Sequence, residues 1–144
     1  MFNLDLKDKV ILITGGSDGL GYASAELLSS EGAKVIICGR RGDYLNEKAK
    51  TISEKTNNNV LAIQADVSKA EDCKRLVEET ISKFKKIDIL VNNAGASAAA
   101  LFEDVSDKNW EDDINLKLMS TIRMCRLVIP YMKSNDKGVI INAT

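Results

Sequence analysis

The chain has 144 residues, 44% of them hydrophobic, which suffices for the core of one ordinary domain. Its net charge of −1 leaves no basic surface to indicate a nucleic acid or an anionic lipid as partner. No apolar run approaches the roughly 18 residues of a membrane span, and residues 1–9 contain no apolar signal segment. We therefore expect a cytoplasmic protein with no membrane and no nucleic-acid partner.

The cysteines and the lack of histidine limit which disulfides, metal sites and catalytic bases the chain can form. The three cysteines, Cys38, Cys73 and Cys125, lie far apart and form no Cys-x-x-Cys pair. Such spacing fits reduced thiols and argues against a disulfide framework or a zinc site. The sequence contains no histidine, which excludes an imidazole base and any His-containing metal site. We expect no metal site.

Five short runs rich in β-branched residues alternate with helical patterns along the whole sequence. They are residues 9–14, 34–38, 60–64, 87–92 and 138–142. Near-continuous apolar runs of this length suit a parallel sheet covered on both faces. The alternation predicts a single α/β domain over residues 1–144, with a doubly wound parallel sheet of the Rossmann type. Right-handed crossovers place the first strand centrally, in the order 3-2-1-4-5.

A glycine-rich loop follows the first run. It reads Thr14-Gly-Gly-Ser-Asp-Gly-Leu-Gly21 and opens a helical pattern. The free N–H groups and partial positive charge at the start of a helix form a natural seat for a pyrophosphate. The spacing is not that of a P-loop, because no Gly-Lys-Ser/Thr follows. A turn that merely packs a helix on a strand is the alternative, and the flanking strand and helix favour dinucleotide binding.

The end of the second run indicates which dinucleotide. An NAD-binding fold usually places an acid about 20 residues past the glycines, where it holds the ribose 2′-hydroxyl. Here the run ends in Cys38-Gly39-Arg40-Arg41, with no acid in that place. A guanidinium offers a fork of donors and a permanent charge to a 2′-phosphate. The sequence therefore predicts NADP(H) in preference to NAD(H), the alternative being two solvated surface arginines.

Two helices are predicted in the second half of the chain. The first begins with Ser68-Lys69-Ala70-Glu71, the pattern of a capping box in which each end residue's side chain satisfies the other's backbone N–H. The second covers residues 107–134 and is apolar on more than one side, so we expect it to pack against the sheet and against something else, such as another copy of the chain. One apolar stripe of this long helix consists of Trp110, Ile114, Leu118, Ile122, Cys125 and Ile129.

Four motifs in this order resemble the short-chain dehydrogenase/reductase family. They are Thr14-Gly-x-x-x-Gly-x-Gly21, Asp66-Val67, Asn92-Asn93-Ala94-Gly95 and Asn115 within the long helix. The resemblance extends over essentially all 144 residues. It implies hydride transfer between a nicotinamide cofactor and a small-molecule carbonyl or alcohol substrate.

The resemblance also implies a role for each motif residue. Gly15, Ser17, Asp18, Gly19 and Leu20 would contact the phosphates and the adenosine end of the cofactor. Arg40, helped by Arg41, would bind the 2′-phosphate, while Asp66 and Val67 would border the adenine. Asn93, Ala94 and Gly95 would lie beside a cofactor ribose and brace the central strands.

Asn115 would belong to the catalytic set of the family, where it holds a water in a proton relay. Structural alternatives exist for several of these residues. Asp66 and Ser68 could simply start a helix, and Asn93 could be a turn residue in the left-handed conformation. Asn115 could be an ordinary exposed residue of a helix.

The family's chemistry also needs a serine after the fifth strand and a Tyr-x-x-x-Lys pair in which the lysine lowers the pKa of the tyrosine. By spacing, Thr144 falls about one residue short of that serine. The sole Tyr-x-x-x-Lys match is Tyr44 to Lys48, at the adenosine end. We therefore expect a domain truncated after the fifth strand and incomplete at its C-terminus, and an isolated chain that is inactive. A non-catalytic dinucleotide sensor and a dead fragment are the alternatives.

Overall fold

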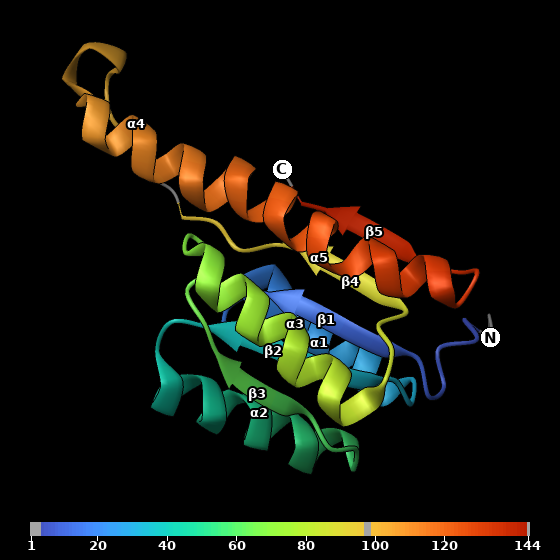
Figure 1. Ribbon diagram of the computed structural model, residues 1–144. Coiled ribbons are helices and arrows are strands. Elements are labelled where there is room, and N and C mark those ends of the chain that lie inside the picture. The colour runs from blue at the N-terminus through green and yellow to red at the C-terminus, as the bar shows by residue number, and fades with distance from the viewer. Residues whose placement is uncertain (1–3, 97–98, 144) are drawn as a thin grey trace.

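A computed structural model describes residues 4–96 and 99–143, and its centre is one parallel five-stranded sheet (Figure 1). The strand order is β3-β2-β1-β4-β5, which confirms the predicted order and class. The strand bounds are β1 Val10–Thr14, β2 Lys34–Gly39, β3 Leu61–Gln64, β4 Ile89–Asn92 and β5 Val139–Asn142. All neighbouring strands run parallel, so their carboxyl ends meet at one edge of the sheet.

Helices cover both faces of the sheet. One face packs against α1 (Gly19–Ser30) and α2 (Gly42–Thr56), and the other packs against α3 (Ala70–Phe84) and α5 (Ser120–Ser134). Every residue of β1 is buried, as a central strand between two layers of helices requires.

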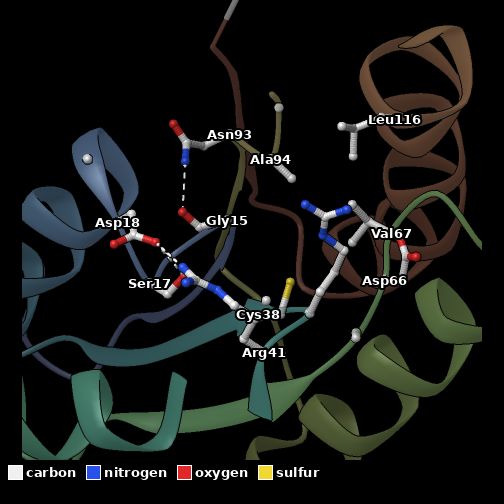
Figure 2. Close-up of a pocket in the computed structure, with 15 residues that line it drawn as sticks. Gly15, Ser17, Asp18, Cys38, Arg41, Asp66, Val67, Asn93, Ala94 and Leu116 are labelled. Atoms are coloured by element: carbon white, nitrogen blue, oxygen red, sulfur yellow. Dashed lines mark hydrogen bonds and ion pairs between the residues drawn. The ribbon is translucent and has the colours of Figure 1, made fainter. Parts of the chain in front are cut away.

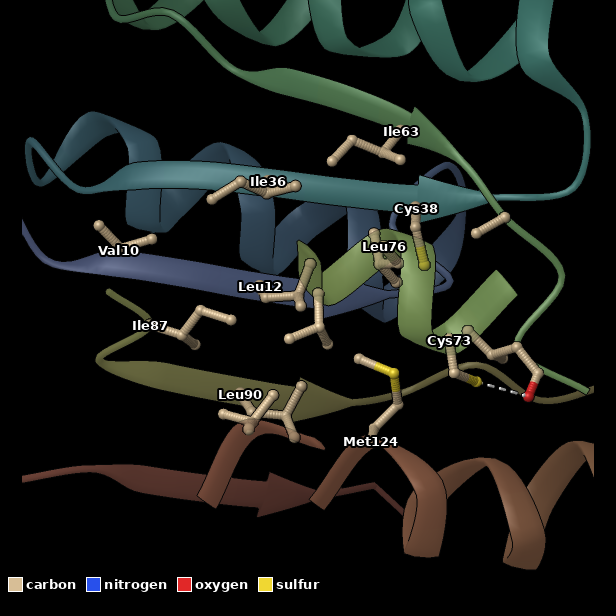
Figure 3. Close-up of a cluster of buried hydrophobic side chains, with 14 of the residues drawn as sticks. Val10, Leu12, Ile36, Cys38, Ile63, Cys73, Leu76, Ile87, Leu90 and Met124 are labelled. Atoms are coloured by element: carbon tan, nitrogen blue, oxygen red, sulfur yellow. Dashed lines mark hydrogen bonds between the residues drawn. The ribbon is translucent and has the colours of Figure 1, made fainter. Parts of the chain in front are cut away.

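The two cores alternate along the strands. Ile11 and Ile13 face α1 and α2, whereas Val10 and Leu12 face α3 and α5 (Figure 3). Burying each such side chain contributes about 1.5–3 kcal/mol. A slip of one residue in the register would exchange the two sets of side chains, so these two cores fix the register and the position of every strand end.

The predicted capping box at the start of α3 is wrong. The cap residue is Lys69, without a side-chain hydrogen bond to the helix. The Ser68 hydroxyl instead donates to Asp66 Oδ1 at 2.6 Å, and the N–H of Asp66 donates to Asp72 Oδ2 at 2.7 Å. The bond from a backbone N–H to an acidic side chain therefore joins Asp66 and Asp72 instead of Ser68 and Glu71. The N–H of Asp66, with Arg75, holds the pKa of the Asp72 carboxyl below its ordinary value, against a raising effect of burial.

The long helix is continuous but not uniform. It comprises α4 (Asp107–Ile114), a π-helical turn (Asn115–Met119) and α5, and Figure 1 shows α4 projecting beyond the sheet. A short 3-10 turn at Phe102–Asp104 precedes it.

The apolar stripe named in the sequence is not the face that packs on the sheet. That face consists of Ser120, Met124, Val128 and Met132. The stripe itself is largely exposed, with Trp110 at 42% and Leu118 at 55%. The helix is thus apolar on two sides, as expected, and self-association through the exposed side stays a prediction.

Two further features concern only the described residues, 4–96 and 99–143. None of their helices is both long and apolar enough to cross a membrane. Their Cys, Asp and Glu side chains nowhere gather in a group of three that could hold a metal ion.

Candidate functional site

A pocket of about 570 Å³ opens at the carboxyl ends of the strands, where the connections from β1 and β4 leave in opposite directions. Such a switch point is where open α/β sheets bind ligands. Its lining residues are Gly15, Ser17, Asp18, Gly19, Cys38, Gly39, Arg40, Arg41, Ala65, Asp66, Val67, Asn93, Ala94, Gly95 and Leu116. The structure thus brings together every residue predicted to bind cofactor except Leu20, which is 77% exposed and lies outside the lining.

The glycines of the loop allow two backbone segments to touch. Gly15 has a φ of +67°, and a Cβ built there would lie 2.9 Å from the Cα of Ala94. A Cβ on Gly21 would collide with the carbonyl oxygen of Gly15 and lie 2.6 Å from Asn93 Nδ2. The loop therefore packs directly on the segment that leaves β4, and no larger residue fits at either position.

The start of α1 is available to an anion. Its cap residue, Asp18, is extended, with no side-chain hydrogen bond to the helix. The first N–H groups of a helix have no acceptor within the helix and carry a partial positive charge. Gly19 lies at this end of α1 and lines the pocket, so the partly positive end of the helix borders the cavity.

Thr14 and Asn93 join the ends of β1 and β4. Thr14 Oγ1 accepts the N–H groups of Asn93 and Ala94, each at 3.0 Å. Asn93 Nδ2 donates to the carbonyls of Thr14 at 3.2 Å and Gly15 at 3.1 Å. The alternative of a left-handed turn is wrong, because Asn93 has no positive φ. These bonds fix the loop position, and a contact with a cofactor ribose stays a prediction.

The two arginines after β2 are not equivalent, although both line the pocket. Arg41 Nη2 lies 2.7 Å from Asp18 Oδ2 (Figure 2), and its guanidinium stacks 4.1 Å from the centroid of the Tyr44 ring. The Arg40 side chain makes no hydrogen bond or ion pair with the described part of the chain, while its carbonyl accepts from Gln64 at 2.9 Å. Arg40 is therefore the guanidinium still free to bind a ligand.

Asp18 is an unexpected acid beside these arginines. The Tyr44 hydroxyl donates to Asp18 Oδ1 at 2.6 Å. This hydrogen bond, together with the charge of Arg41, holds the pKa of the Asp18 carboxyl below its ordinary value, against a raising effect of desolvation. The carboxylate is consequently negative at neutral pH. The spacing of Tyr44 and Lys48 matched a catalytic pair, but this tyrosine hydroxyl is occupied by Asp18.

Asp66 and Val67 form the wall opposite the glycine loop (Figure 2). Val67 is 4% exposed. Asp66 Oδ1 accepts the N–H of Ser68 at 3.1 Å, a local turn that turns the chain from the pocket wall toward α3. The alternative that Asp66 and Ser68 start a helix is not what the structure shows, because these residues form a turn before α3, whose cap residue is Lys69.

Asn115 lies next to the pocket rather than in its lining, where the neighbouring Leu116 takes the place. It is the first residue of the π turn, and single π turns within α-helices are frequent at functional sites. Its Oδ1 accepts from Arg123 Nη2 at 3.4 Å, and Arg123 Nη1 donates to the Ser68 carbonyl at 2.9 Å. Asn115 is half-buried and held from α5, not an ordinary exposed residue. Its catalytic role stays a prediction.

Comparison with known proteins decides the family. The family model described as short chain dehydrogenase matches residues 9–144. The chain belongs to the short-chain dehydrogenase family. Among the curated relatives of this short-chain dehydrogenase is 11-beta-hydroxysteroid dehydrogenase A of Sesamum indicum, 34% identical over 142 residues, which are 98% of this chain and 40% of that protein.

Solved structures of the family match the fold closely. L-sorbose reductase from Gluconobacter frateurii, complexed with NADPH and L-sorbose, has a TM-score of 0.94 at 35% identity over 98% of this chain and 54% of its own. A 7α-hydroxysteroid dehydrogenase complexed with NADH has a TM-score of 0.92 at 31% identity, over 100% and 57%. This short-chain dehydrogenase chain spans about half the length of the relatives it matches.

Sequence reasoning missed four lining residues of this short-chain dehydrogenase: Cys38, Gly39, Ala65 and Leu116. Three of them lie at or directly after a strand end, and the rule that ligands bind at the carboxyl edge would have found them. Leu116 follows the Asn115 motif, but its proximity depends on how the long helix crosses the sheet.

Cys38 provides a test of the pocket floor. The side chain is 1% exposed, and burial raises the pKa of its thiol to about 12. We expect native protein at pH 8 to be alkylated by iodoacetamide at the half-buried Cys125 while Cys38 reacts after denaturation, as peptide mass spectrometry would show. Because the folded pKa lies above the unfolded value of about 8.5, this thiol's contribution to stability is lost as pH rises from about 8.5 toward 12. Rapid native labelling of Cys38 would contradict its place under the pocket.

Proposed function

We propose that these 144 residues form the cofactor-binding part of an NADP(H)-dependent oxidoreductase acting on a carbonyl or alcohol substrate. The observation that carries the proposal is the meeting of two features in one pocket. A helix start without a side-chain cap lies behind a glycine loop, and Arg40 follows β2 with a guanidinium that has no partner among residues 4–96 and 99–143. Together they offer seats for a pyrophosphate and for a further phosphate.

The donor set fits a dinucleotide. The Gly15–Gly19 loop and the first turn of α1 supply backbone N–H groups to the pyrophosphate, and no side chain at Gly15, Gly19 or Gly21 blocks the approach. Val67 and Asp66 border the adenine. When bound, the nicotinamide supplies the hydride donor or acceptor of the reaction. Asn93 and Ala94 hold the loop on which the cofactor rests.

Preference for NADP(H) rests on Arg40. Related proteins have been crystallised with either cofactor, NADPH in L-sorbose reductase and NADH in 7α-hydroxysteroid dehydrogenase. Family membership therefore does not determine the preference between NADP(H) and NAD(H). A guanidinium that has no partner in the described part of the chain, at the position where an acid would bind a ribose hydroxyl, favours the phosphorylated cofactor.

For the reaction itself, we propose that Asn115 helps to hold a water of the proton relay. Its half-buried position at the π turn next to the pocket supports this role. The family's acid–base tyrosine has no counterpart in Tyr44, whose hydroxyl binds Asp18. We therefore expect the chain by itself to bind cofactor without turning over a carbonyl substrate.

A thermal-shift titration tests the proposal. A ligand that binds only the folded state stabilises it by about 2.7 kcal/mol at 100 times its Kd. We expect NADP(H) to raise the melting temperature at lower concentrations than NAD(H). Equal shifts in melting temperature with both cofactors would contradict the cofactor preference. No shift with either would mean that the pocket does not bind a nicotinamide dinucleotide. Carbonyl reduction by the isolated chain that Asn115→Ala abolishes would show that the predicted inactivity is wrong.

A further inference from the structure

Three side chains meet where the glycine loop approaches the start of α2. The Asp18 carboxylate binds Arg41 through Oδ2 at 2.7 Å and the Tyr44 hydroxyl through Oδ1 at 2.6 Å. Arg41 in turn stacks on the Tyr44 ring, 4.1 Å from its centroid. Both oxygens of the carboxylate and one face of the guanidinium are therefore engaged within a closed triangle.

Fold stability does not explain this triangle. The side chains of Arg41 and Asp18 are 66% and 57% exposed. An ion pair as exposed as this one contributes only about 0–1 kcal/mol. Of the ion pairs within residues 4–96 and 99–143, this is the one that joins two residues of the pocket lining. We therefore expect the pair of Asp18 and Arg41 to affect ligand binding in the pocket.

The charges around the pocket rim set up a competition. Arg41 cannot give its charge in full to a ligand phosphate while Asp18 lies 2.7 Å from it. A phosphate close enough to contact Arg41 also comes within a few ångströms of a negative carboxylate, which repels it. A neutral ribose hydroxyl is neither repelled by Asp18 nor dependent on the charge of Arg41. Arg40 is outside the competition because no acid pairs with it in the described part of the chain.

We propose that Asp18 is a specificity-determining residue that reduces the preference for NADP(H) over NAD(H), by pairing with Arg41 and by repelling the 2′-phosphate. The inference rests on the proposed function, because it assumes that the cofactor's adenosine end lies at Arg40 and Arg41. In this arrangement Arg40 sets the direction of the preference, and Asp18 limits its size.

Adenosine fragments test the inference without the nicotinamide end. We would measure by calorimetry the affinities of adenosine 2′,5′-bisphosphate and of adenosine 5′-monophosphate for the 144-residue chain and for Asp18→Asn. The amide keeps the shape of the carboxylate and removes its charge. We expect the ratio of the two affinities to rise about three- to tenfold, as the removal of one exposed charge a few ångströms from a phosphate predicts.

Two further variants show whether the change in the affinity ratio comes from the pair of Asp18 and Arg41. Glu26→Gln removes the same charge from α1, in an ion pair with Lys55 at 3.0 Å that involves no pocket residue, and should leave the ratio unchanged. Adding Arg41→Met to Asp18→Asn should reduce the gain, since the released guanidinium supplies part of it and the lost repulsion supplies the rest. The single Arg41→Met variant completes the cycle.

An unchanged or smaller ratio in Asp18→Asn overturns the inference, as does a gain that survives intact without Arg41. A melting temperature close to that of the parent chain shows that the variant is folded. If the parent chain binds neither fragment, the proposed function fails and this inference with it. If it binds both and only the Asp18→Asn ratio stays constant, the proposed function stands and this inference alone falls.

Discussion

Replacing Arg40 by aspartate should reverse the cofactor preference. A charge-assisted hydrogen bond to a phosphate contributes about 1.5–3 kcal/mol, so its loss alone weakens NADPH binding by roughly 10- to 150-fold. The new carboxylate also repels the 2′-phosphate and can accept the ribose 2′-hydroxyl of NADH. We expect the ratio of NADPH to NADH affinity to fall by at least about 100-fold, measured by nucleotide fluorescence titration.

Two other variants make the Arg40 result specific. Arg40→Met removes the guanidinium without adding repulsion, so it should lower NADPH affinity and leave NADH affinity nearly unchanged. Arg126→Asp makes the same charge reversal at an exposed position of α5 outside the pocket and should change neither. Equal losses for both cofactors in Arg40→Asp would mean that this residue supports the loop rather than recognising the phosphate.

The sheet could be predicted because its signals are local and redundant. Each strand is a short apolar run, and the two helical layers require both faces of β1 to be apolar, as they are. Once the order of strands is known, the motifs that follow β1, β2, β3 and β4 must meet at one edge. Most of the pocket could therefore be assigned from sequence, whereas Leu116 could not.

The features that the sequence did not predict depend on how side chains of distant segments are placed relative to one another. The Ser68 to Glu71 spacing suits a capping box, but the Asp66 carboxylate competes for the serine hydroxyl, and that competition decides the cap. The apolar period of the long helix gives no sign of a π turn at Asn115. The pairing of Asp18 with Arg41 joins residues 23 positions apart. It depends on how α2 leaves the sheet, so the sequence predicted that Arg41 would help Arg40 to bind the phosphate and did not show that Arg41 is paired with Asp18.

Gly21→Ala sets local helix propensity against packing, and the structure predicts that packing prevails. Gly21 belongs to α1, where alanine is intrinsically favoured over glycine by about 1 kcal/mol. Its Cβ, however, would collide with the Gly15 carbonyl and separate that carbonyl from Asn93 Nδ2, which now donates to it at 3.1 Å. Overpacking costs about 1–3 kcal/mol, and the lost hydrogen bond adds about 1 kcal/mol. After the propensity gain of about 1 kcal/mol is subtracted, we expect the free energy of unfolding to fall by about 1–3 kcal/mol in urea denaturation.

Gly19→Ala is the matched control, two residues earlier in the same turn. Gly19 has a φ of +53°, but a Cβ there would find no atom within 4 Å. Its cost is therefore backbone strain alone, about 1–2 kcal/mol. If the close approach of the glycine loop to β4 shapes the site, Gly21→Ala should also weaken NADPH binding far more than Gly19→Ala does. A Gly21→Ala protein as stable as its parent would mean that propensity prevails and that the loop has room to move away from Asn93.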